Sequence, residues 1–214
     1  MKMTDVREDF INALVDLDEA KCIDIAKQRV EAGEDPFIIL EDLREATDRI
    51  GNMFEEGRFF VSDLMMAGEI LKQIMEVLKP AFGDRKIESK GTVVIGTVEG
   101  DVHDIGKNIV TALLEAEGFT VVDLGVDQPP EAFINAIKED KPLVVSLSGL
   151  LTEAIDSMKK TIDAIKAAGL RDNVKIIIGG GRTDEEAKEY TGADDWSDDA
   201  TSGVRKIKKL AGVA

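Results

Sequence analysis

Apolar side chains in the first 82 residues recur at the three- and four-residue spacing of amphipathic helices. Short polar or glycine-containing stretches separate four such segments, and Pro36 suits the first turn of the third segment. The fourth is expected to begin near Ser62-Asp63 and to end at Pro80. Four consecutive helices with short connections are typical of an antiparallel bundle. The predicted helices cover about residues 10–17, 23–33, 36–57 and 62–80.

The pattern changes after residues 83–91, a polar segment that we interpret as a linker and hinge. From residue 92 onward, short β-branched apolar runs alternate with amphipathic segments, which predicts right-handed βαβ units and a doubly wound parallel sheet. We therefore expect a helical bundle domain at 1–88 and a Rossmann- or flavodoxin-like α/β domain at 89–214. The predicted strands are 92–98, 119–125, 142–149 and 174–181, with a short segment near 193–196; the predicted helices are 107–118, 129–140, 153–169, 183–192 and 200–212.

Three chemically unusual loops follow the predicted strands. His103 lies just beyond the first strand, Ser148-Gly149 ends the third, and Gly179–Gly181 ends the fourth. In open parallel sheets, ligands bind at the carboxyl ends of the strands. The three loops are therefore expected to meet at one ligand-binding edge.

The charge of the chain limits its partners. The net charge is −16, and neither half contains a basic segment, which argues against nucleic acid and anionic membrane as partners. The N-terminus lacks the apolar core of a signal peptide, and no apolar run reaches the roughly 18 residues of a membrane span. We predict a cytoplasmic protein whose single cysteine, Cys22, is a buried thiol.

His103 is the only histidine in the chain, and two interpretations of it stand side by side. A lone histidine is commonly a structural residue. Alternatively, Asp101 orients its ring, as carboxylates do for metal-bound imidazoles. One histidine cannot complete a zinc site, so a metal bound here would arrive with its other ligands attached, as in a macrocycle. No serine or cysteine nucleophile precedes His103 in a strand-to-helix turn.

The small residues of the loops carry little information by themselves. Gly179–Gly181 does not form G-x-G-x-x-G, and residues 96–101 lack the Gly-Lys-Ser/Thr ending of a phosphate-binding loop. Ser146 and Ser148 are explained equally well as small residues of a buried strand.

Together, however, the loops resemble a known family. Residues 101–106 (DVHDIG) are similar to the D-x-H-x-x-G element of cobalamin-binding domains, Ser148-Gly149-Leu150 to the S-x-L element, and Gly179-Gly180 to the closing G-G. The intervals of 41 and 28 residues suit the family. Residues 51–60 (GNMFEEGRFF) and 66–69 (MAGE) resemble the helical cap of methyl-carrying corrinoid proteins. The resemblance covers nearly the whole chain and is strongest to methylamine- and methanol-type corrinoid proteins and to the cobalamin-binding module of methionine synthase.

The resemblance implies a role for each matching residue. His103 would replace the dimethylbenzimidazole of the cofactor as the lower cobalt ligand, and Asp101 would hydrogen-bond it. The displaced nucleotide tail would run between the first and fourth strands, and Phe60 would cover the upper face of the corrin. The implied cofactor-binding residues are His103, Asp101, Asp104, Gly106, Ser148, Leu150, Thr152, Gly179, Gly180 and Phe60.

Two positions depart from the pattern of the relatives. Ala154 stands where they often have a hydroxyl that extends the His–Asp hydrogen-bond relay, so Thr152 or water would have to substitute. Phe60-Val61-Ser62 replaces a Phe-Leu-Pro sequence, and Ser62 is a candidate N-cap for the fourth helix.

The implied function is a corrinoid methyl carrier that cycles between Co(I) and methyl-Co(III), with little or no turnover alone. Its partners would be a substrate-specific methyltransferase, a second methyltransferase with a thiol or folate-type acceptor, and a reductive activator. One alternative is the small subunit of an adenosylcobalamin-dependent mutase, which would not need the helical cap. A cobalamin-dependent sensor is the other, and it would need an additional output domain. A helical bundle and flavodoxin-like domain without corrin is the simplest rival.

Overall fold

The computed structural model describes residues 3–83 and 89–213, and residues 84–88 of the predicted linker lie outside the described residues. The chain divides into two compact units, one formed mainly by the helices before residue 89 and the other mainly by the residues after it.

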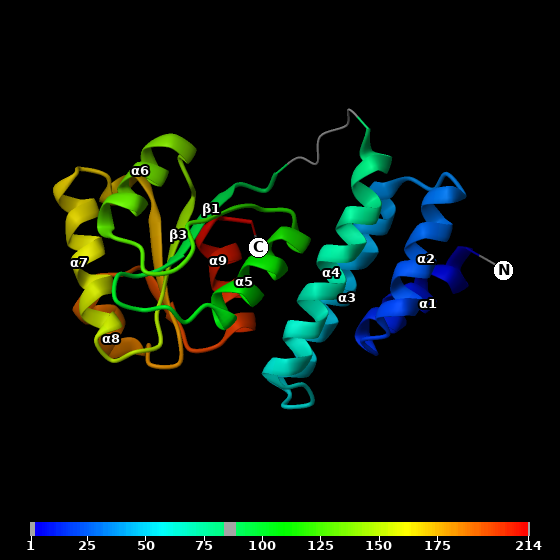
Figure 1. Ribbon diagram of the computed structural model, residues 1–214, viewed down its shortest axis with the longest axis horizontal. Helices are drawn as coiled ribbons and strands as arrows, with labels where there is room; N and C mark the ends of the chain where they lie inside the picture. Colours follow the sequence, from blue (N-terminus) through cyan, green and yellow to red (C-terminus); the bar gives the residue numbers. More distant parts are fainter. Residues whose placement is uncertain (1–2, 84–88, 214) are drawn as a thin grey trace. The chain divides into compact units, whose positions relative to one another are not determined.

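The first unit is a four-helix bundle, as predicted (Figure 1). Helix α1 packs on α2 and α3, and α4 packs on the same two helices. Helices α1, α3 and α4 turn a stripe of aliphatic side chains inward, and those of Leu14, Ile39, Leu43 and Ile74 are fully buried. The helices are α1 (Met3–Val15), α2 (Glu19–Glu31), α3 (Pro36–Glu55) and α4 (Val61–Phe82).

Helix α4 differs from the prediction at both ends. Phe60, not Ser62, is its N-cap, because the carboxylate of Asp63 accepts a hydrogen bond of 2.7 Å from the Phe60 backbone N–H. Pro80 lies inside the helix instead of ending it. The missing proline N–H removes one helical hydrogen bond, but the next turn keeps Phe82 buried against Phe37, with ring centroids 5.0 Å apart. Packing therefore extends the helix past the proline.

A buried ion pair joins α2 to α3. The guanidinium of Arg29 lies 2.7 Å from the carboxylate of Asp42, and both side chains are almost fully buried. Arg29 also binds Glu34, and Arg7 of α1 reaches the other oxygen of Asp42. A buried charge without its partner is costly, so these contacts fix the packing of α1, α2 and α3.

Cys22 is buried in α2, as predicted. Burial raises the pKa of its thiol to about 12, which leaves it protonated and unreactive at neutral pH. Within residues 3–83 and 89–213, no helix is long and apolar enough to cross a membrane.

The second unit is a doubly wound α/β domain, which confirms the predicted fold class. Its five described strands are all parallel in the order β2-β1-β3-β4-β5. The short segment expected near residues 193–196 is the edge strand β5. The elements are β1 (Thr92–Thr97), α5 (Ile105–Glu117), β2 (Thr120–Asp123), α6 (Pro130–Asp140), β3 (Val144–Ser148), α7 (Ala154–Ala167), the 3-10 turn η1 (Arg171–Asn173), β4 (Lys175–Gly179), α8 (Glu185–Thr191), β5 (Asp195–Ser197) and α9 (Ala200–Leu210).

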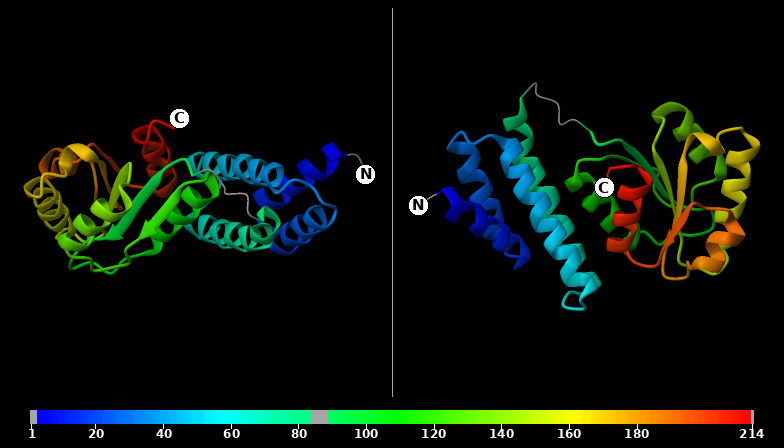
Figure 2. Two further views of the ribbon diagram at one scale, coloured as in Figure 1. Left: turned by 90° about the horizontal axis from the view of Figure 1, so that it is seen from above. Right: turned by 180° about the vertical axis from the view of Figure 1, so that it is seen from behind.

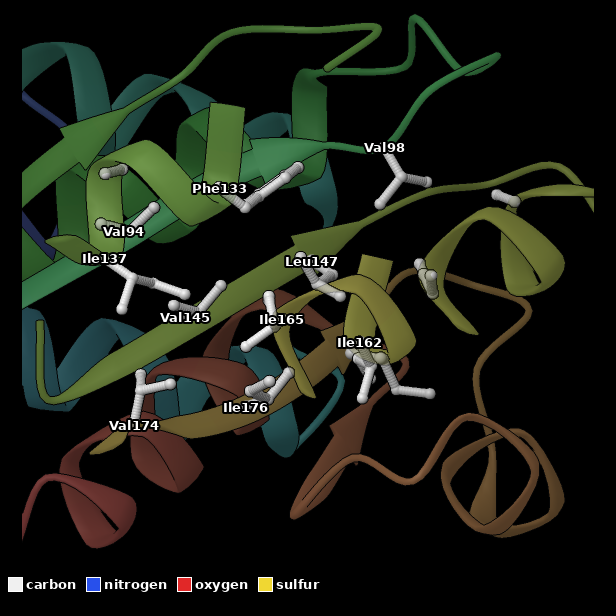
Figure 3. Packing of buried hydrophobic residues seen from close by; sticks show 14 of the residues in the cluster. Val94, Val98, Phe133, Ile137, Val145, Leu147, Ile162, Ile165, Val174 and Ile176 are labelled. Atoms are coloured by element: carbon white, nitrogen blue, oxygen red, sulfur yellow. The ribbon is translucent and has the colours of Figure 1, made fainter. Parts of the chain in front are cut away.

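The two faces of the sheet are covered by different helices (Figure 2). Helices α6 and α7 cover one face, where Val145, Leu147 and Ile176 pack on Phe133 and Ile162 in a continuous apolar core (Figure 3). The alternate residues of the same strands face α5 and α9 on the other side. The strand order reverses between β1 and β3, the place where sheets of this topology bind ligands.

Candidate functional site

His103 lies at the carboxyl end of β1, in the short loop that leads into α5. The hydroxyl of Thr97 donates a hydrogen bond of 3.0 Å to the backbone carbonyl of His103, which fixes the loop to the strand. The ring nitrogen Nδ1 lies 2.7 Å from Asp101 Oδ1, while about half of the side chain is exposed. A carboxylate at Nδ1 holds the proton there and leaves the Nε2 lone pair available to a metal.

The carboxylate of Asp101 is itself fully buried and fully bonded. Oδ1 also accepts a hydrogen bond from the His103 backbone N–H at 2.9 Å, and Oδ2 accepts from the N–H groups of Leu150 at 2.7 Å and Leu151 at 3.0 Å. Burial would raise the pKa of Asp101, but the three backbone donors and the imidazole outweigh it and lower the pKa to about 2. Asp101 is therefore ionised throughout the physiological pH range.

Ala154 offers no hydroxyl to the Asp101 carboxylate, as the sequence indicates. Ala154 lies in the first turn of α7, and a Cβ built on Gly149 would come within 2.5 Å of the Ala154 Cβ. Thr152 lies in the turn before α7, and the four hydrogen bonds of the Asp101 carboxylate do not include its hydroxyl. Among the described residues, Oδ2 of Asp101 is bonded by the backbone N–H groups of Leu150 and Leu151.

A cavity of about 330 Å³ opens beside His103, between the sheet and the helices α5 and α9. Its walls come from the ends of β1, β3, β4 and β5 and from the facing sides of the two helices. They are mostly aliphatic or small. The sheet contributes Ile95, Ser146, Ser148, Ile177, Gly179 and Ser197, and the helices contribute Gly106, Lys107, Val110, Ala200, Gly203 and Ile207.

The glycines of the cavity have two different structural roles: one allows a close approach of two loops, and the others leave space open. A Cβ on Gly180 would lie 1.9 Å from the carbonyl oxygen of Gly149, and its φ of +136° also disfavours any side chain, so this residue lets two loops touch. A Cβ on Gly106 would meet nothing within 4 Å, and one on Gly179 would meet only Ser197 O at 3.7 Å. The absence of side chains at Gly106 and Gly179 therefore enlarges the cavity.

Exposed apolar side chains lie on the loops around His103. Val102 and Ile105 flank it in the chain and are 66% and 53% exposed, and Leu150 and Leu151 are also exposed beyond β3. Large apolar groups exposed together next to a metal-competent imidazole are typical of a ligand-binding surface.

The predicted site residues divide into three sets. Asp101 lies behind His103, as its hydrogen bonds show. Thr152 is exposed outside the cavity lining, and Phe60 belongs to the helical unit, where 70% of it is exposed. The residues that line the cavity are His103, Asp104, Gly106, Ser148, Leu150, Gly179 and Gly180.

Of the helical wall of the cavity, sequence reasoning named only Gly106, and it missed the buried Lys107. Lys107 Nζ donates to Asp123 Oδ2 at 2.5 Å and to Asn108 Oδ1 at 2.8 Å, which ties α5 to β2. The position of Lys107 directly after Gly106 of the histidine motif was the only sequence signal that it belongs to the site. Gly203 of α9 belongs to none of the sequence motifs, and only tertiary packing brings it to the cavity.

Comparison with known proteins gives consistent matches over both units. Residues 91–205 match the B12 binding domain family, and residues 6–79 match a second B12 binding domain family. The chain is 38% identical over 202 residues to trimethylamine corrinoid protein 1 of Methanosarcina acetivorans, which covers 93% of this chain and 94% of the relative. It is also 37% identical over 187 residues to dimethylamine corrinoid protein 1 of the same organism. This match covers 86% of this chain and 88% of the relative.

Two solved structures are similar over almost the whole chain. A cobalamin-binding protein from Desulfitobacterium hafniense DCB-2 has a TM-score of 0.80 at 38% identity and covers 97% of this chain and 99% of its own. The methanol:cobalamin methyltransferase complex MtaBC from Methanosarcina barkeri has a TM-score of 0.85 at 28% identity and covers 100% of this chain and 82% of the matched chain.

The fold, the paired Asp101 and His103 and the cavity define a cobalamin-binding protein. The donor set fits the cofactor, because a corrin supplies the equatorial nitrogens to its cobalt and needs one imidazole, and the open space at Gly106 suits a nucleotide tail. With its matches over both units, the chain belongs to the methyltransferase-associated corrinoid proteins.

Proposed function

We propose that the protein carries a methyl group between two methyltransferases. The bound corrinoid supplies the cobalt that accepts and releases this group. The observation that supports the proposal most directly is the contact of 2.7 Å between His103 Nδ1 and the buried carboxylate of Asp101, at the mouth of a cavity with small-residue walls.

His103 acts as the lower cobalt ligand in this proposal. Asp101 holds the ring by Nδ1, so that Nε2 keeps its lone pair and gains basicity. Four hydrogen bonds to a carboxylate that stays ionised fix the orientation of the ring. The protein can therefore stabilise one cobalt state over another through the strength of a single ligand bond.

The cavity receives the nucleotide tail of the cofactor. Ser148, Gly179 and Gly180 form the sheet side of its opening, and Gly106 leaves room on α5. Asp104 and Leu150 lie beside them at the rim, and Thr152 follows on the adjoining turn. Burying the tail between the sheet and two helices removes it from water and leaves the lower face of the cobalt to His103.

The helical unit protects the reactive face of the corrin. Phe60, Val61, Met65 and Met66 at the start of α4 are all exposed and apolar. We assign Phe60 to cover the corrin, because an apolar cover excludes water and oxygen from reduced cobalt.

The names of the relatives indicate the partners. They are trimethylamine and dimethylamine corrinoid proteins, and a solved relative is part of a methanol:cobalamin methyltransferase complex. For this chain we propose one methyltransferase specific for a small methylated substrate, a second with a thiol or folate-type acceptor, and a reductive activator, all in the cytoplasm. Substrate choice then lies in the first enzyme, and the chain has little or no turnover alone.

The ligand assignment can be tested by electron paramagnetic resonance of the reconstituted Co(II) protein. Because His103 is the only histidine, nitrogen-15 histidine labelling changes one candidate ligand only. We expect the nitrogen splitting to change from a triplet pattern to a doublet pattern on labelling. An unchanged triplet would mean that the benzimidazole remains on cobalt and that the role of His103 is wrong.

Methyl transfer is tested separately. The reconstituted protein, reduced and mixed with a trimethylamine-, dimethylamine- or methanol-type methyltransferase and its substrate, should show the absorbance of methylcobalamin. His103→Ala should retain corrinoid through the cavity but lose the nitrogen splitting. Tight binding of adenosylcobalamin, with no methylation by any of the three enzymes, would favour a mutase subunit instead.

A further inference from the structure

Asp101 belongs to a turn, residues 98–101, that lies in an exposed part of the chain. From Glu99 to Gly106, every residue except Asp101 is exposed. Gly100 has a φ of +86°, and a Cβ built on it would meet nothing within 4 Å. Within the turn, the Asp101 N–H donates a hydrogen bond of 3.1 Å to the carbonyl of Val98. Hydrogen bonds, more than packing, therefore hold this turn in place.

Asp127, in the loop between β2 and α6, makes two hydrogen bonds to the turn. Its Oδ1 accepts a hydrogen bond of 2.7 Å from the Gly100 N–H, and its own N–H donates to the carbonyl of Asp101 at 3.0 Å. Asp127 has a φ of +53°, a conformation that glycine, asparagine and aspartate adopt more readily than other residues. The two bonds lie on either side of the peptide that joins Gly100 to Asp101.

The loop of Asp127 is itself held in place. Gly125 accepts a hydrogen bond of 2.9 Å from the Thr97 N–H, and the Gln128 N–H donates to the carbonyl of Thr97 at 2.9 Å. Residues 129–130 are both proline and restrict the backbone where α6 begins. Asp127 therefore bonds the turn from a loop that is fixed to the end of β1.

We propose that Asp127 is a positioning residue, which fixes the turn so that the Asp101 carboxylate stays 2.7 Å from His103 Nδ1. This inference rests on the proposed role of His103 as the lower cobalt ligand. The backbone N–H groups of residues 150–151 hold the side-chain end of Asp101, whereas Asp127 holds its backbone end. Without Asp127, the turn at Gly100 is free to shift, and the imidazole loses part of its orientation.

The test measures the dissociation constant of the full-length protein for cobinamide, a corrinoid without the nucleotide tail, by the absorbance change of the corrin. Cobinamide has no axial nitrogen of its own, so nitrogen splitting in its Co(II) complex comes from His103. Asp127→Ala removes the acceptor of the Gly100 N–H. We expect it to weaken binding about three- to tenfold, the effect of about one lost hydrogen bond, and to lower the fraction with histidine bound.

Three companion variants separate the side chain from the backbone. Asp127→Asn keeps an acceptor and suits positive φ, so it should bind within about twofold of wild type. Asp127→Gly suits positive φ but has no acceptor, so it should weaken binding. Asp18→Ala is the matched control and should bind like wild type, because this exposed carboxylate also accepts one backbone N–H, that of Lys21 at 3.1 Å, but lies in the helical unit.

The same change is then made in a protein without the ligand. The His103→Ala background is expected to retain cobalamin through its tail, so cobalamin is the probe for both backgrounds. Asp127→Ala should weaken cobalamin binding when His103 is present and leave it unchanged in His103→Ala, because no ring remains to be positioned. A general loss of structure would weaken binding in both. Thermal melting of the apo variants checks that each remains folded.

The outcomes separate this inference from the proposed function. If Asp127→Ala or Asp127→Gly binds cobinamide as wild type does, or if the loss persists in the His103→Ala background, the positioning role is wrong while corrinoid binding stands. If wild type shows no nitrogen splitting with cobinamide, His103 is not the ligand, and the inference falls with that role. If no corrinoid binds, the proposed function itself fails.

Discussion

Replacing Asp101 by asparagine tests the site most sharply, because it changes one atom of a buried group. The carboxylate only accepts hydrogen bonds, and it accepts four from the Leu150 and Leu151 N–H groups and from the backbone and ring of His103. An amide has one acceptor oxygen and one donor nitrogen. Either orientation of the amide therefore places a donor against donors.

The cost follows from which atoms lose their partner. If the amide nitrogen replaces Oδ2, the N–H groups of Leu150 and Leu151 lose their acceptor. If it replaces Oδ1, the His103 N–H loses its acceptor, and the ring must accept at Nδ1 and carry its proton on Nε2. At about 1–3 kcal/mol for each buried donor left unpaired, we expect Asp101→Asn to destabilise the apo protein by about 2–4 kcal/mol. The second orientation also removes the lone pair that binds cobalt, so we expect coordination to weaken by about 10–100-fold.

Two assays follow these effects. Urea unfolding of the apo protein measures stability, and the nitrogen splitting of the Co(II) form measures the fraction with histidine bound. Asp163→Asn, which removes an exposed pair with Lys159 at 2.9 Å, is the control and should cost less than about 1 kcal/mol. If Asp101→Asn keeps both wild-type stability and histidine ligation, the proposed orienting role of Asp101 is refuted.

Acid titration gives an independent measure of the same carboxylate. Folding lowers the pKa of Asp101 from 3.8 to about 2, which corresponds to about 2 kcal/mol of stability. Because the folded pKa is depressed, this contribution is complete above about pH 4 and is lost as the pH falls through about 2. The stability difference between wild type and Asp101→Asn should therefore be constant near neutrality and shrink by about 2 kcal/mol on acidification. A difference that changes between neutral pH and pH 5 would contradict this.

Three further predictions concern other parts of the chain. Asp42→Ala removes one of the two carboxylates that bind the buried Arg29, which keeps Glu34, and should lower the free energy of unfolding by about 2–3 kcal/mol in urea; a loss below about 1 kcal/mol would contradict the role of this ion pair. Cys22, with its pKa raised to about 12, should react with iodoacetamide at pH 8 only after denaturation, as mass spectrometry will show; rapid labelling of the native protein would refute its burial. Gly180→Ala should be more destabilising than Gly212→Ala in thermal melting, because both glycines have positive φ but only at Gly180 would the new Cβ lie 1.9 Å from a carbonyl oxygen; equal losses would contradict the close approach.

Local patterns determined most of the fold. The spacing of apolar residues located four helices and the strand–helix alternation, because period 3.6 and buried β-branched runs are properties of single segments. The same pattern predicted that His103, Ser148 and Gly179 lie at one edge of the sheet, because the carboxyl ends of parallel strands lie at the same edge. Pro80 shows the limit of this reasoning: its local preference ends a helix, but the burial of Phe82 keeps the helix going.

The sequence by itself thus determined the histidine motif, the order of strands and helices along the chain, and the family. Only the tertiary structure decided what surrounds the motif. It showed that the backbone N–H groups of Leu150 and Leu151 bond the carboxylate of Asp101 and that α9 supplies Gly203 to the cavity. These facts depend on contacts between residues up to about a hundred positions apart, whose distances are set when the helices pack on the sheet and cannot be read from any one segment.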